Sequence, residues 1–258
     1  MPASAASALA RAKERGHRLF ICTGRSAPEV YPRFFDLGFE GIVGGAGGYA
    51  AVGSTVLLDE RMPAEHVQTL TRMWEELDAF YVWQGPDQMG PSRGYLDFFV
   101  PRAGENPQDW VEYGESVTPF VVDIEGGSFT KVTAYVRPEN ASMERISAAL
   151  PDGYRAIIGS VGAAGYVPFE VLPTRLSKAV GIEAVCKHLG IPLSRSVAIC
   201  DSNNDVEAVA RAGVGISIGD GCEALVEVAD IVAPAVGDDG FAWALAAAGL
   251  IDEAPNPA

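Results

Sequence analysis

Segments rich in helix-forming residues alternate with short, continuously apolar runs over the first sixty residues of the chain. Gly16 stands where a helix C-terminal glycine belongs, and Pro28 stands near the start of the second helical segment. The predicted elements are a helix at Ala3–Arg15, a strand at His17–Cys22, a helix from Ser26 to about Leu37, and a strand that begins at Gly41. Such alternation indicates a parallel sheet that helices cover on both faces.

The same alternation returns after about Phe169. Three helices are predicted at Lys178–Leu189, Asp205–Ala212 and Cys222–Ala229, and three strands at Val197–Cys200, Val214–Ile218 and Ile231–Ala233. The first and third stretches therefore belong to one α/β core with a Rossmann-like parallel sheet.

The middle of the chain has a different pattern, typical of an inserted α+β domain. A helix is predicted at Glu65–Leu77, strands at Phe80–Trp83, Tyr95–Val100 and Phe129–Val136, and a further helix at Glu139–Leu150. We therefore expect a core formed by residues 1–60 and 169–258, interrupted by a cap at residues 61–168. The cap contains aromatic residues that either line a pocket or form its hydrophobic core: Tyr81, Trp83, Tyr95, Phe98 and Trp110.

Charge and composition narrow the range of partners. With 48% hydrophobic and 21% charged residues, the chain is typical of a folded globular protein. Its net charge of -15 opposes binding to nucleic acid, which depends on Lys and Arg, and an anionic ligand would need local cations and a metal. No membrane segment or secretory signal is expected. The four cysteines lack C-x-x-C spacing, which favours a reducing cytoplasm, and the three histidines lack metal-ligand spacing.

Candidate chemistry follows the predicted strands, because ligands of open α/β sheets bind beyond the carboxyl ends of the strands. Thr23 and Gly24 follow the first strand and can bind a phosphoryl oxygen, although a capped helix start is the favoured explanation when they are taken alone. The segment from Asp201 to Asp205 follows a buried strand, and its carboxylates suit Mg²⁺ or cap the next helix. Lys178 begins a helix, where its charge opposes the helix dipole; it either neutralises an anion or is simply exposed.

Taken together, the sequences TGRS, EVLPTRLSKAVGI and AICDSNNDVEAVARAGVGISIGDGCEALVEVADIV resemble motifs two, three and four of the haloacid dehalogenase-like superfamily, in its Cof branch. The resemblance covers Ala8–Ala50 and Phe169–Gly240, with the insert at the place of the α/β cap of that branch. It implies that Thr23 and the N–H of Gly24 bind the transferred phosphoryl group. Lys178 would neutralise charge during catalysis, Asn204 would contact phosphate, and Mg²⁺ would be held by Asp201 with Asp205 supporting the metal site.

The sequence departs from the family pattern at two places. Cys200 stands where the family usually has glycine. No Asp-x-Asp-Gly motif, which in the family supplies the nucleophile and the acid/base aspartate, precedes the helix Ala3–Arg15. The strand of that motif is expected between the strands leading to Thr23 and Asp201, and without it buried backbone groups would each cost about 1–3 kcal/mol. We therefore expect that the natural product starts upstream of Met1, or that the sheet is repaired in another way.

The leading functional hypothesis is a Mg²⁺-dependent phosphatase of small phosphorylated metabolites, such as sugar phosphates, which works through an aspartyl-phosphate. The chain as given would be inactive, because the nucleophilic aspartate is absent. The alternative is a catalytically inactive protein that binds phosphate or a metabolite or serves in regulation. A nucleotide-binding Rossmann domain is a third possibility, which the lack of G-x-G-x-x-G after a first strand disfavours. The sequence names neither the substrate nor the oligomeric state.

Overall fold

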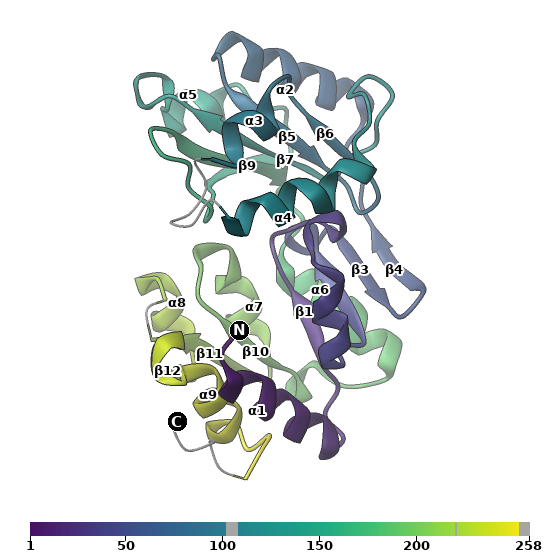
Figure 1. The fold of residues 1–258 in the computed structure, drawn as a ribbon, viewed down its shortest axis with the longest axis vertical. Helices are drawn as coiled ribbons and strands as arrows, with labels where there is room; N and C mark the ends of the chain where they lie inside the picture. Colours follow the sequence, from purple (N-terminus) through teal and green to yellow (C-terminus); the bar gives the residue numbers. More distant parts are fainter. Residues whose placement is uncertain (102–107, 220, 253–258) are drawn as a thin grey trace. The chain divides into compact units, whose positions relative to one another are not determined.

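A computed structural model describes residues 1–101, 108–219 and 221–252 of the chain (Figure 1). The contacts divide it into two units, each of which is described by itself. Unit 1 comprises Met1–Gly24, Pro32–Leu58 and Ser177–Ala258, and unit 2 comprises Arg25–Tyr31 and Asp59–Leu176. The sequence pattern predicts the cap at residues 61–168. Unit 2 begins slightly before that range and ends slightly after it, and it also includes seven residues from between the first two strands.

Unit 1 contains two sheets. The first has the order β1-β2-β3-β4 and consists of β1 (Phe20–Cys22), β2 (Gly41–Gly44), β3 (Tyr49–Val52) and β4 (Thr55–Asp59). The second has the order β10-β11-β12 and consists of β10 (Val197–Cys200), β11 (Val214–Ile218) and β12 (Ile231–Ala233). The pairs β1·β2, β10·β11 and β11·β12 are parallel, whereas β2 and β3 are antiparallel. The α/β character predicted from the sequence is therefore confirmed.

The helices of unit 1 pack on these sheets through small and aliphatic residues. They are α1 (Ala3–Glu14), α6 (Lys178–Leu189), α7 (Val206–Arg211), α8 (Glu223–Val228) and α9 (Gly240–Ala247). Short 3₁₀ turns lie at Pro32–Leu37, Gly45–Gly47, Leu193–Arg195, Asn203–Asp205 and Val236–Asp238. The purple α1 and the yellow α9 lie side by side in Figure 1, and Leu9 and Leu245 share their core cluster.

Unit 2 is a five-stranded antiparallel sheet with helices. Its strand order is β6-β5-β7-β9-β8, formed by β5 (Phe80–Gln84), β6 (Met89–Pro91), β7 (Lys131–Val136), β8 (Tyr154–Ile158) and β9 (Val167–Pro173). The helices are α2 (Ala64–Glu76), α3 (Tyr95–Phe99), α4 (Gln108–Val117) and α5 (Met143–Ala148), with 3₁₀ turns at Ala27–Glu29, Thr118–Phe120 and Pro138–Asn140.

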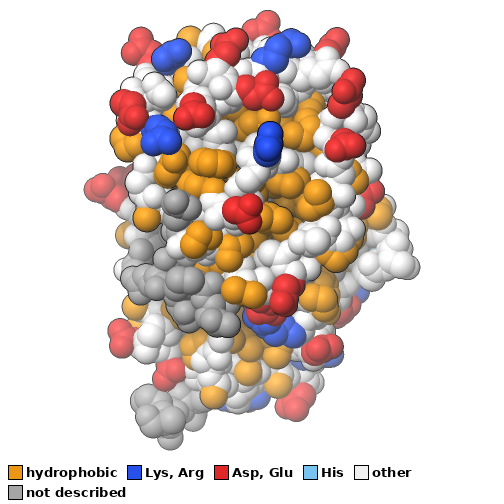
Figure 2. All heavy atoms as spheres, turned by 45° about the horizontal axis from the view of Figure 1, so that its top comes forward, with side chains coloured by type: hydrophobic (Ala, Val, Ile, Leu, Met, Phe, Trp, Pro, Cys, Tyr) orange, Lys and Arg blue, Asp and Glu red, His pale blue; other side chains and the backbone are white. Residues whose placement is uncertain are grey.

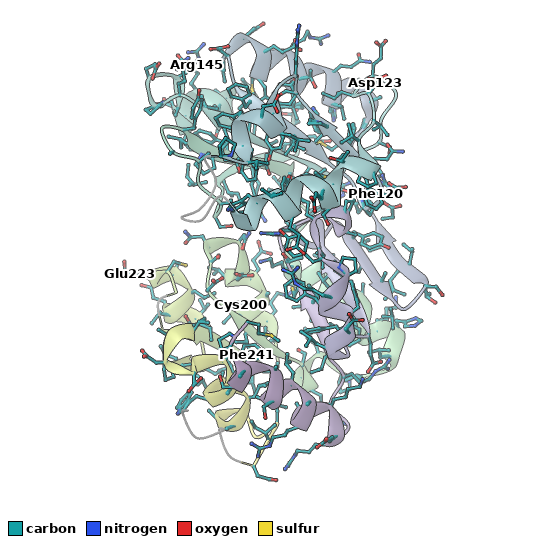
Figure 3. The ribbon with its side chains drawn as sticks, in the orientation of Figure 1. Phe120, Asp123, Arg145, Cys200, Glu223 and Phe241 are labelled. Carbon is teal, nitrogen blue, oxygen red and sulfur yellow. The ribbon has the colours of Figure 1, made fainter. Side chains whose placement is uncertain are left out.

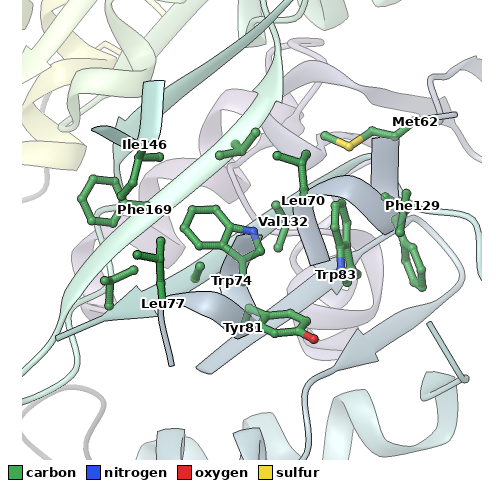
Figure 4. Packing of buried hydrophobic residues seen from close by; sticks show 14 residues of the cluster. Met62, Leu70, Trp74, Leu77, Tyr81, Trp83, Phe129, Val132, Ile146 and Phe169 are labelled. Carbon is green, nitrogen blue, oxygen red and sulfur yellow. The ribbon is translucent and has the colours of Figure 1, made fainter. Parts of the chain in front are cut away.

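The two faces of this sheet carry different side chains, because successive residues of a strand point to opposite faces. On one face, Trp83 and Val132 pack with Leu70 and Trp74 of α2 in a cluster whose labelled members Figure 4 shows. Leu70, Trp74, Trp83 and Val132 are fully buried, and burying a side chain of this size contributes about 1.5–3 kcal/mol. The spacing of apolar residues in α2 therefore predicts its packing face correctly.

On the opposite face, helices α3 and α4 cover part of the sheet. Tyr95 and Phe98 of α3 pack there with Val82, Tyr135 and other members of a second apolar cluster. The aromatic residues Tyr81, Trp83, Tyr95 and Phe98 are all 4% exposed or less, so the interpretation that they form the hydrophobic core of the cap is confirmed. Beside this cluster lies a group of buried polar side chains that the strands also point to this face: Gln84, Lys131, Thr133 and Glu170.

Two predicted elements differ from the structure. The predicted strand Tyr95–Val100 is the helix α3, whose buried residues Tyr95, Phe98 and Phe99 follow a helical spacing. A short apolar run does not distinguish a strand from a helix, so the aromatic content was misleading. The predicted helix from Ser26 to Leu37 consists of two 3₁₀ turns, because Pro32 disfavours helical backbone at the residue before it.

The excess of acidic residues in the sequence is visible at the surface. Figure 2 shows acidic side chains spread over the viewed face, with apolar side chains exposed between them. Several large apolar residues are more than a third exposed in unit 2, among them Val111, Val121 and Ile158. Over the described parts of the chain, the structure contains no helix with both the length and the apolar character needed to cross a membrane.

Candidate active site

The predicted site residues of unit 1 lie at the carboxyl ends of β1 and β10 and at the start of α6. β1 ends at Cys22, and the N–H of Thr23 continues its pairing by donating to the carbonyl of Val43 at 2.8 Å. β10 ends at Cys200, which Figure 3 labels, and Asp201 follows it. The strand ends thus present Thr23 and Asp201 at the positions where open α/β sheets bind ligands.

Lys178 is buried, with 5% of its surface exposed, so the interpretation of Lys178 as an ordinary surface lysine is wrong. Its Nζ donates to Oδ1 of Asn204 at 3.0 Å and forms an ion pair with Asp205. Burial acts to lower the pKa of Lys178, but the attraction and hydrogen bond of Asp205 outweigh it, and the net pKa is raised. The lysine is therefore a permanent cation at the first turn of α6.

Gly24 approaches the same group from β1. A Cβ placed on Gly24 would lie 3.1 Å from Nδ2 of Asn204, whose Oδ1 accepts from Lys178. Gly24 and Lys178, which are far apart in the sequence, therefore both lie beside Asn204, and Lys178 also pairs with the neighbouring Asp205. Their binding of phosphate stays a prediction. The N–H groups, amide and ammonium found there are the kinds of donor that bind a phosphoryl group.

Asp205 has two partners, and one of them is the helix cap that the sequence left open as an alternative. Its Oδ2 accepts from the N–H of Ser202 at 3.1 Å, which closes a capping box before α7. Its other oxygen binds Lys178. Both oxygens are engaged and Asp205 is 3% exposed, so its role at a metal stays a prediction.

Asp201 is exposed, and its Oδ1 accepts from Oγ of Ser202 at 2.9 Å. An exposed carboxylate at a strand end fits Mg²⁺, which usually binds proteins through one or two carboxylates and keeps several waters. Within residues 1–101, 108–219 and 221–252, however, no group of three or more His, Cys, Asp or Glu side chains is arranged to hold a metal. Asp201 is therefore one fitting ligand of a site that would need others.

Two thiols beside these residues, those of Cys22 and Cys200, have no site role in the sequence-based prediction. Burial raises the pKa of Cys22 to about 11, with smaller contributions from Lys178 and Asp205. Burial also raises the pKa of Cys200, followed by the charge of Asp205. Burial therefore favours the protonated form of both thiols.

A glycine-rich segment that the sequence indicates only as a turn also contacts the site. Gly47 has φ +94°, and a Cβ placed there would lie 1.9 Å from the carbonyl oxygen of Ser177, directly before Lys178. Only glycine permits this approach. The glycines from Gly44 to Gly48 are the only sequence feature that could have indicated this contact. Nothing in the neighbouring sequence indicates that the partner lies more than 120 positions away.

The strands β1 and β10 both end their sheets. In the described residues, β1 pairs with β2 and β10 with β11, so each has one edge without a neighbouring strand. These two strands are the ones expected to flank the strand of the first family motif. That expected strand, and with it a start of the natural product upstream of Met1, stays a prediction.

Comparison with known proteins gives the family. The family of haloacid dehalogenase-like hydrolases matches residues 1–245. YkrA of Bacillus subtilis (strain 168), a protein provisionally named as a phosphatase, is 24% identical over 251 residues, which cover 97% of this chain and 92% of YkrA. The 5-amino-6-(5-phospho-D-ribitylamino)uracil phosphatase YitU of the same organism is 31% identical over 80 residues, 31% of this chain and 30% of YitU.

Solved structures show the same fold. A hypothetical protein from Geobacillus kaustophilus HTA426 superimposes with a TM-score of 0.75 at 26% identity, covering 97% of this chain and 93% of the other. The subclass IIB sugar phosphatase BT4131 superimposes with a TM-score of 0.76 at 20% identity and the same coverage. The fold and the family match thus define the class of protein as a hydrolase. The chain belongs to the haloacid dehalogenase-like hydrolases, and the resemblance seen in its motifs is confirmed.

Proposed function

We propose that this protein is a Mg²⁺-dependent phosphatase of small phosphorylated metabolites, such as sugar phosphates. The observation that carries the proposal is the convergence of Gly24, Lys178 and Asn204 at the carboxyl ends of the strands and the start of α6. YitU and BT4131 are named as phosphatases, which supports the same reaction class, monophosphate hydrolysis.

The side chains of this protein have separate roles in the proposed reaction. The hydroxyl of Thr23, the N–H of Gly24 and the amide of Asn204 bind the oxygens of the phosphoryl group, and Lys178 balances their charge. Asp205 keeps Lys178 protonated and oriented through their ion pair. Asp201 would be a ligand of Mg²⁺, which when bound supplies further positive charge at the phosphoryl oxygens.

The nucleophile in this proposal is an aspartate on a strand that pairs with the edges of β1 and β10. Its carboxylate oxygen attacks phosphorus, and the oxygen of the metabolite leaves as an alcohol with a proton from the acid/base aspartate of the same motif. Water, which returns a proton to that aspartate, then cleaves the aspartyl-phosphate to phosphate and the free nucleophile. Two unpaired strand edges in one unit support this position.

The test compares this chain with a chain extended at its N-terminus by a strand that ends in the Asp-x-Asp-Gly motif of the family. Hydrolysis of p-nitrophenyl phosphate and of a panel of sugar phosphates is measured with and without Mg²⁺. Turnover by the extended chain alone, dependent on Mg²⁺, is the expected result. If neither chain is active but both bind phosphate, the protein is instead a non-catalytic phosphate-binding member of the family, the second candidate that the missing motif favours.

Lys178→Met supplies the residue-level test, with Lys187→Met as its control on the exposed part of the same helix. A hydrogen bond to a charged group contributes about 1.5–3 kcal/mol, so Lys178→Met should weaken phosphate binding by roughly 10- to 100-fold in calorimetric titration. Lys187→Met should leave the affinity unchanged. Equal affinities in the two variants would contradict the proposed phosphate site.

A further inference from the structure

The chain passes between the two units directly beside the candidate phosphate site. Gly24 is the last residue of its segment in unit 1, and Arg25 is the first of the seven residues that belong to unit 2. The chain returns at Ser177, immediately before Lys178. Two residues assigned to phosphate binding are therefore covalently joined to backbone that unit 2 holds.

The backbone of Arg25–Tyr31 is held by Glu29, a carboxylate that the proposed reaction does not use. Glu29 is 5% exposed. Its Oε2 accepts from the N–H and the Oγ of Ser26, each at 2.7 Å, and from Nε2 of Gln84, also at 2.7 Å. Its Oε1 accepts from the hydroxyl of Tyr113 at 3.2 Å. Donors from the segment itself, β5 and α4 thus surround one carboxylate.

The surroundings of Glu29 keep these donors in place. Gln84 is fixed in turn because its Oε1 accepts from Oγ1 of Thr133 at 2.8 Å. Burial raises the pKa of Tyr113 well above its ordinary value, and the charge of Glu29 adds to this, so the hydroxyl keeps its proton and remains a donor. A buried carboxylate is costly unless it is hydrogen-bonded, and here four donors meet that requirement.

Arg25 reinforces the attachment at the end of the segment that adjoins Gly24. Its guanidinium lies 5.8 Å from the ring centroid of Tyr31 and 5.5 Å from that of Trp110, and it donates to the carbonyl of Glu29 at 3.2 Å. Side-chain and backbone contacts therefore fix both ends of the turn that Glu29 organises.

We propose that Glu29 is a positioning residue for phosphate binding, because it fixes to unit 2 the backbone that continues from Thr23 and Gly24. The inference deepens the proposed function and rests on it. Loss of the carboxylate releases the turn, and the N–H of Gly24 then samples orientations that do not meet a phosphoryl oxygen. Glu29 acts through hydrogen bonds rather than through its charge, because the four donors that it contacts are all uncharged.

The test uses three variants of the full chain. Glu29→Ala removes every acceptor, whereas Glu29→Gln keeps one oxygen for Ser26 and Gln84 and can donate to the hydroxyl of Tyr113. Glu170→Gln is the matched control: Glu170 is 6% exposed on the same sheet face, and its ion-pair partner is Lys131 of β7, at 2.6 Å, rather than a residue of Arg25–Tyr31.

Two measurements separate anchoring from general stability. Hydrogen exchange followed by mass spectrometry reports on the backbone of residues 23–31, and calorimetric titration with inorganic phosphate and Mg²⁺ reports on the site. Glu29→Ala should raise exchange of that peptide and weaken phosphate binding, each by about tenfold or more, the equivalent of one lost hydrogen bond to a charged group. Glu29→Gln should restore most of both quantities, and Glu170→Gln should change neither by more than about twofold.

Several outcomes would overturn the inference. Faster hydrogen exchange in Glu29→Ala with unchanged phosphate affinity would show that Glu29 orders the segment without affecting phosphate binding. Equal losses of affinity in Glu29→Ala and Glu170→Gln would reduce Glu29 to a structural residue, and so would failure of Glu29→Gln to recover affinity. If the unmodified chain itself binds no phosphate, the proposed function fails first, and that result is seen before any variant is compared.

Discussion

The ion pair of Lys178 and Asp205 allows the site to be tested through stability. Their side chains are 6% and 4% exposed, and Nζ of Lys178 binds both Asp205 and Asn204. Lys178→Met leaves the carboxylate of Asp205 buried beside uncharged groups, the N–H of Ser202 and the thiol of Cys200. Breaking a buried pair in this way costs about 3–5 kcal/mol. That is a large fraction of a typical domain stability of roughly 5–15 kcal/mol.

The measurement is differential scanning calorimetry of three variants beside the unmodified chain. For a chain of this size, each kcal/mol lowers Tm by roughly 2–4 °C, so Lys178→Met should lower the Tm of unit 1 by roughly 6–20 °C. Asp205→Asn alone should also destabilise, because it leaves the lysine charge buried. The double variant Lys178→Met, Asp205→Asn should recover at least half of the summed losses, because neither charge then remains buried without its partner.

Additive losses in the double variant would refute the reasoning. So would a loss below about 1 kcal/mol in Lys178→Met, since this is the value typical of an exposed ion pair. Either result would mean that water or another group compensates the charges, and that the two side chains are not coupled in the folded protein.

Three further predictions concern the packing around the site. Ala46 has φ 56°, which costs a residue with a Cβ about 1–2 kcal/mol. Ala46→Gly relieves this strain and loses about 0.4–1 kcal/mol through the greater entropy of the unfolded chain, so it should raise the free energy of unfolding by up to about 1.5 kcal/mol in urea denaturation; a decrease would contradict the assigned backbone. A Cβ on Gly181 would lie 2.3 Å from Cγ1 of Val43, so Gly181→Ala should cost about 1–3 kcal/mol in the same assay, and adding Val43→Ala should recover part of it. The Cys22 thiol keeps its proton in the folded state up to a pKa of about 11, against 9.0 as the ordinary value, so its contribution to stability is complete below about pH 9 and is lost as the pH rises through about 11. The stability difference between the unmodified chain and Cys22→Ala, measured at about pH 8 and about pH 11, should therefore shrink at the higher pH, and a constant difference would argue against a buried thiol.

The sequence predicts those features that depend on neighbouring residues. The helix Lys178–Leu189 agrees with α6 in full, and the strand Val197–Cys200 agrees with β10, because each has a clear apolar pattern and a closing glycine or polar residue. The grouping of Gly24, Lys178 and Asn204 was predicted from strand ends and family motifs together. The role of Asp205 in both a helix cap and an ion pair was only half anticipated, since spacing alone indicated the cap.

Contacts between distant residues were beyond prediction. Glu29 binds Gln84, 55 residues away, and Tyr113, 84 residues away, and nothing in the local sequence marks either as a partner. In Tyr95–Phe99, the period of a strand and the period of a helix would each bury aromatic residues, so the sequence does not distinguish the two. The segment is a helix because of its packing in the folded unit. Hydrophobic pattern fixes an element and its buried face, whereas the partners of a buried polar group depend on the completed fold.

The division of the chain also has a consequence for folding. Unit 2 is almost continuous, whereas unit 1 joins residues before Leu58 to residues after Ser177. At a synthesis rate of about 5–20 residues per second, the helices and strands that complete unit 1 are made on the order of ten seconds after its N-terminal strands. Unit 2 can form in that interval and bring the two halves of unit 1 closer, which lowers the entropy cost of closing so long a loop.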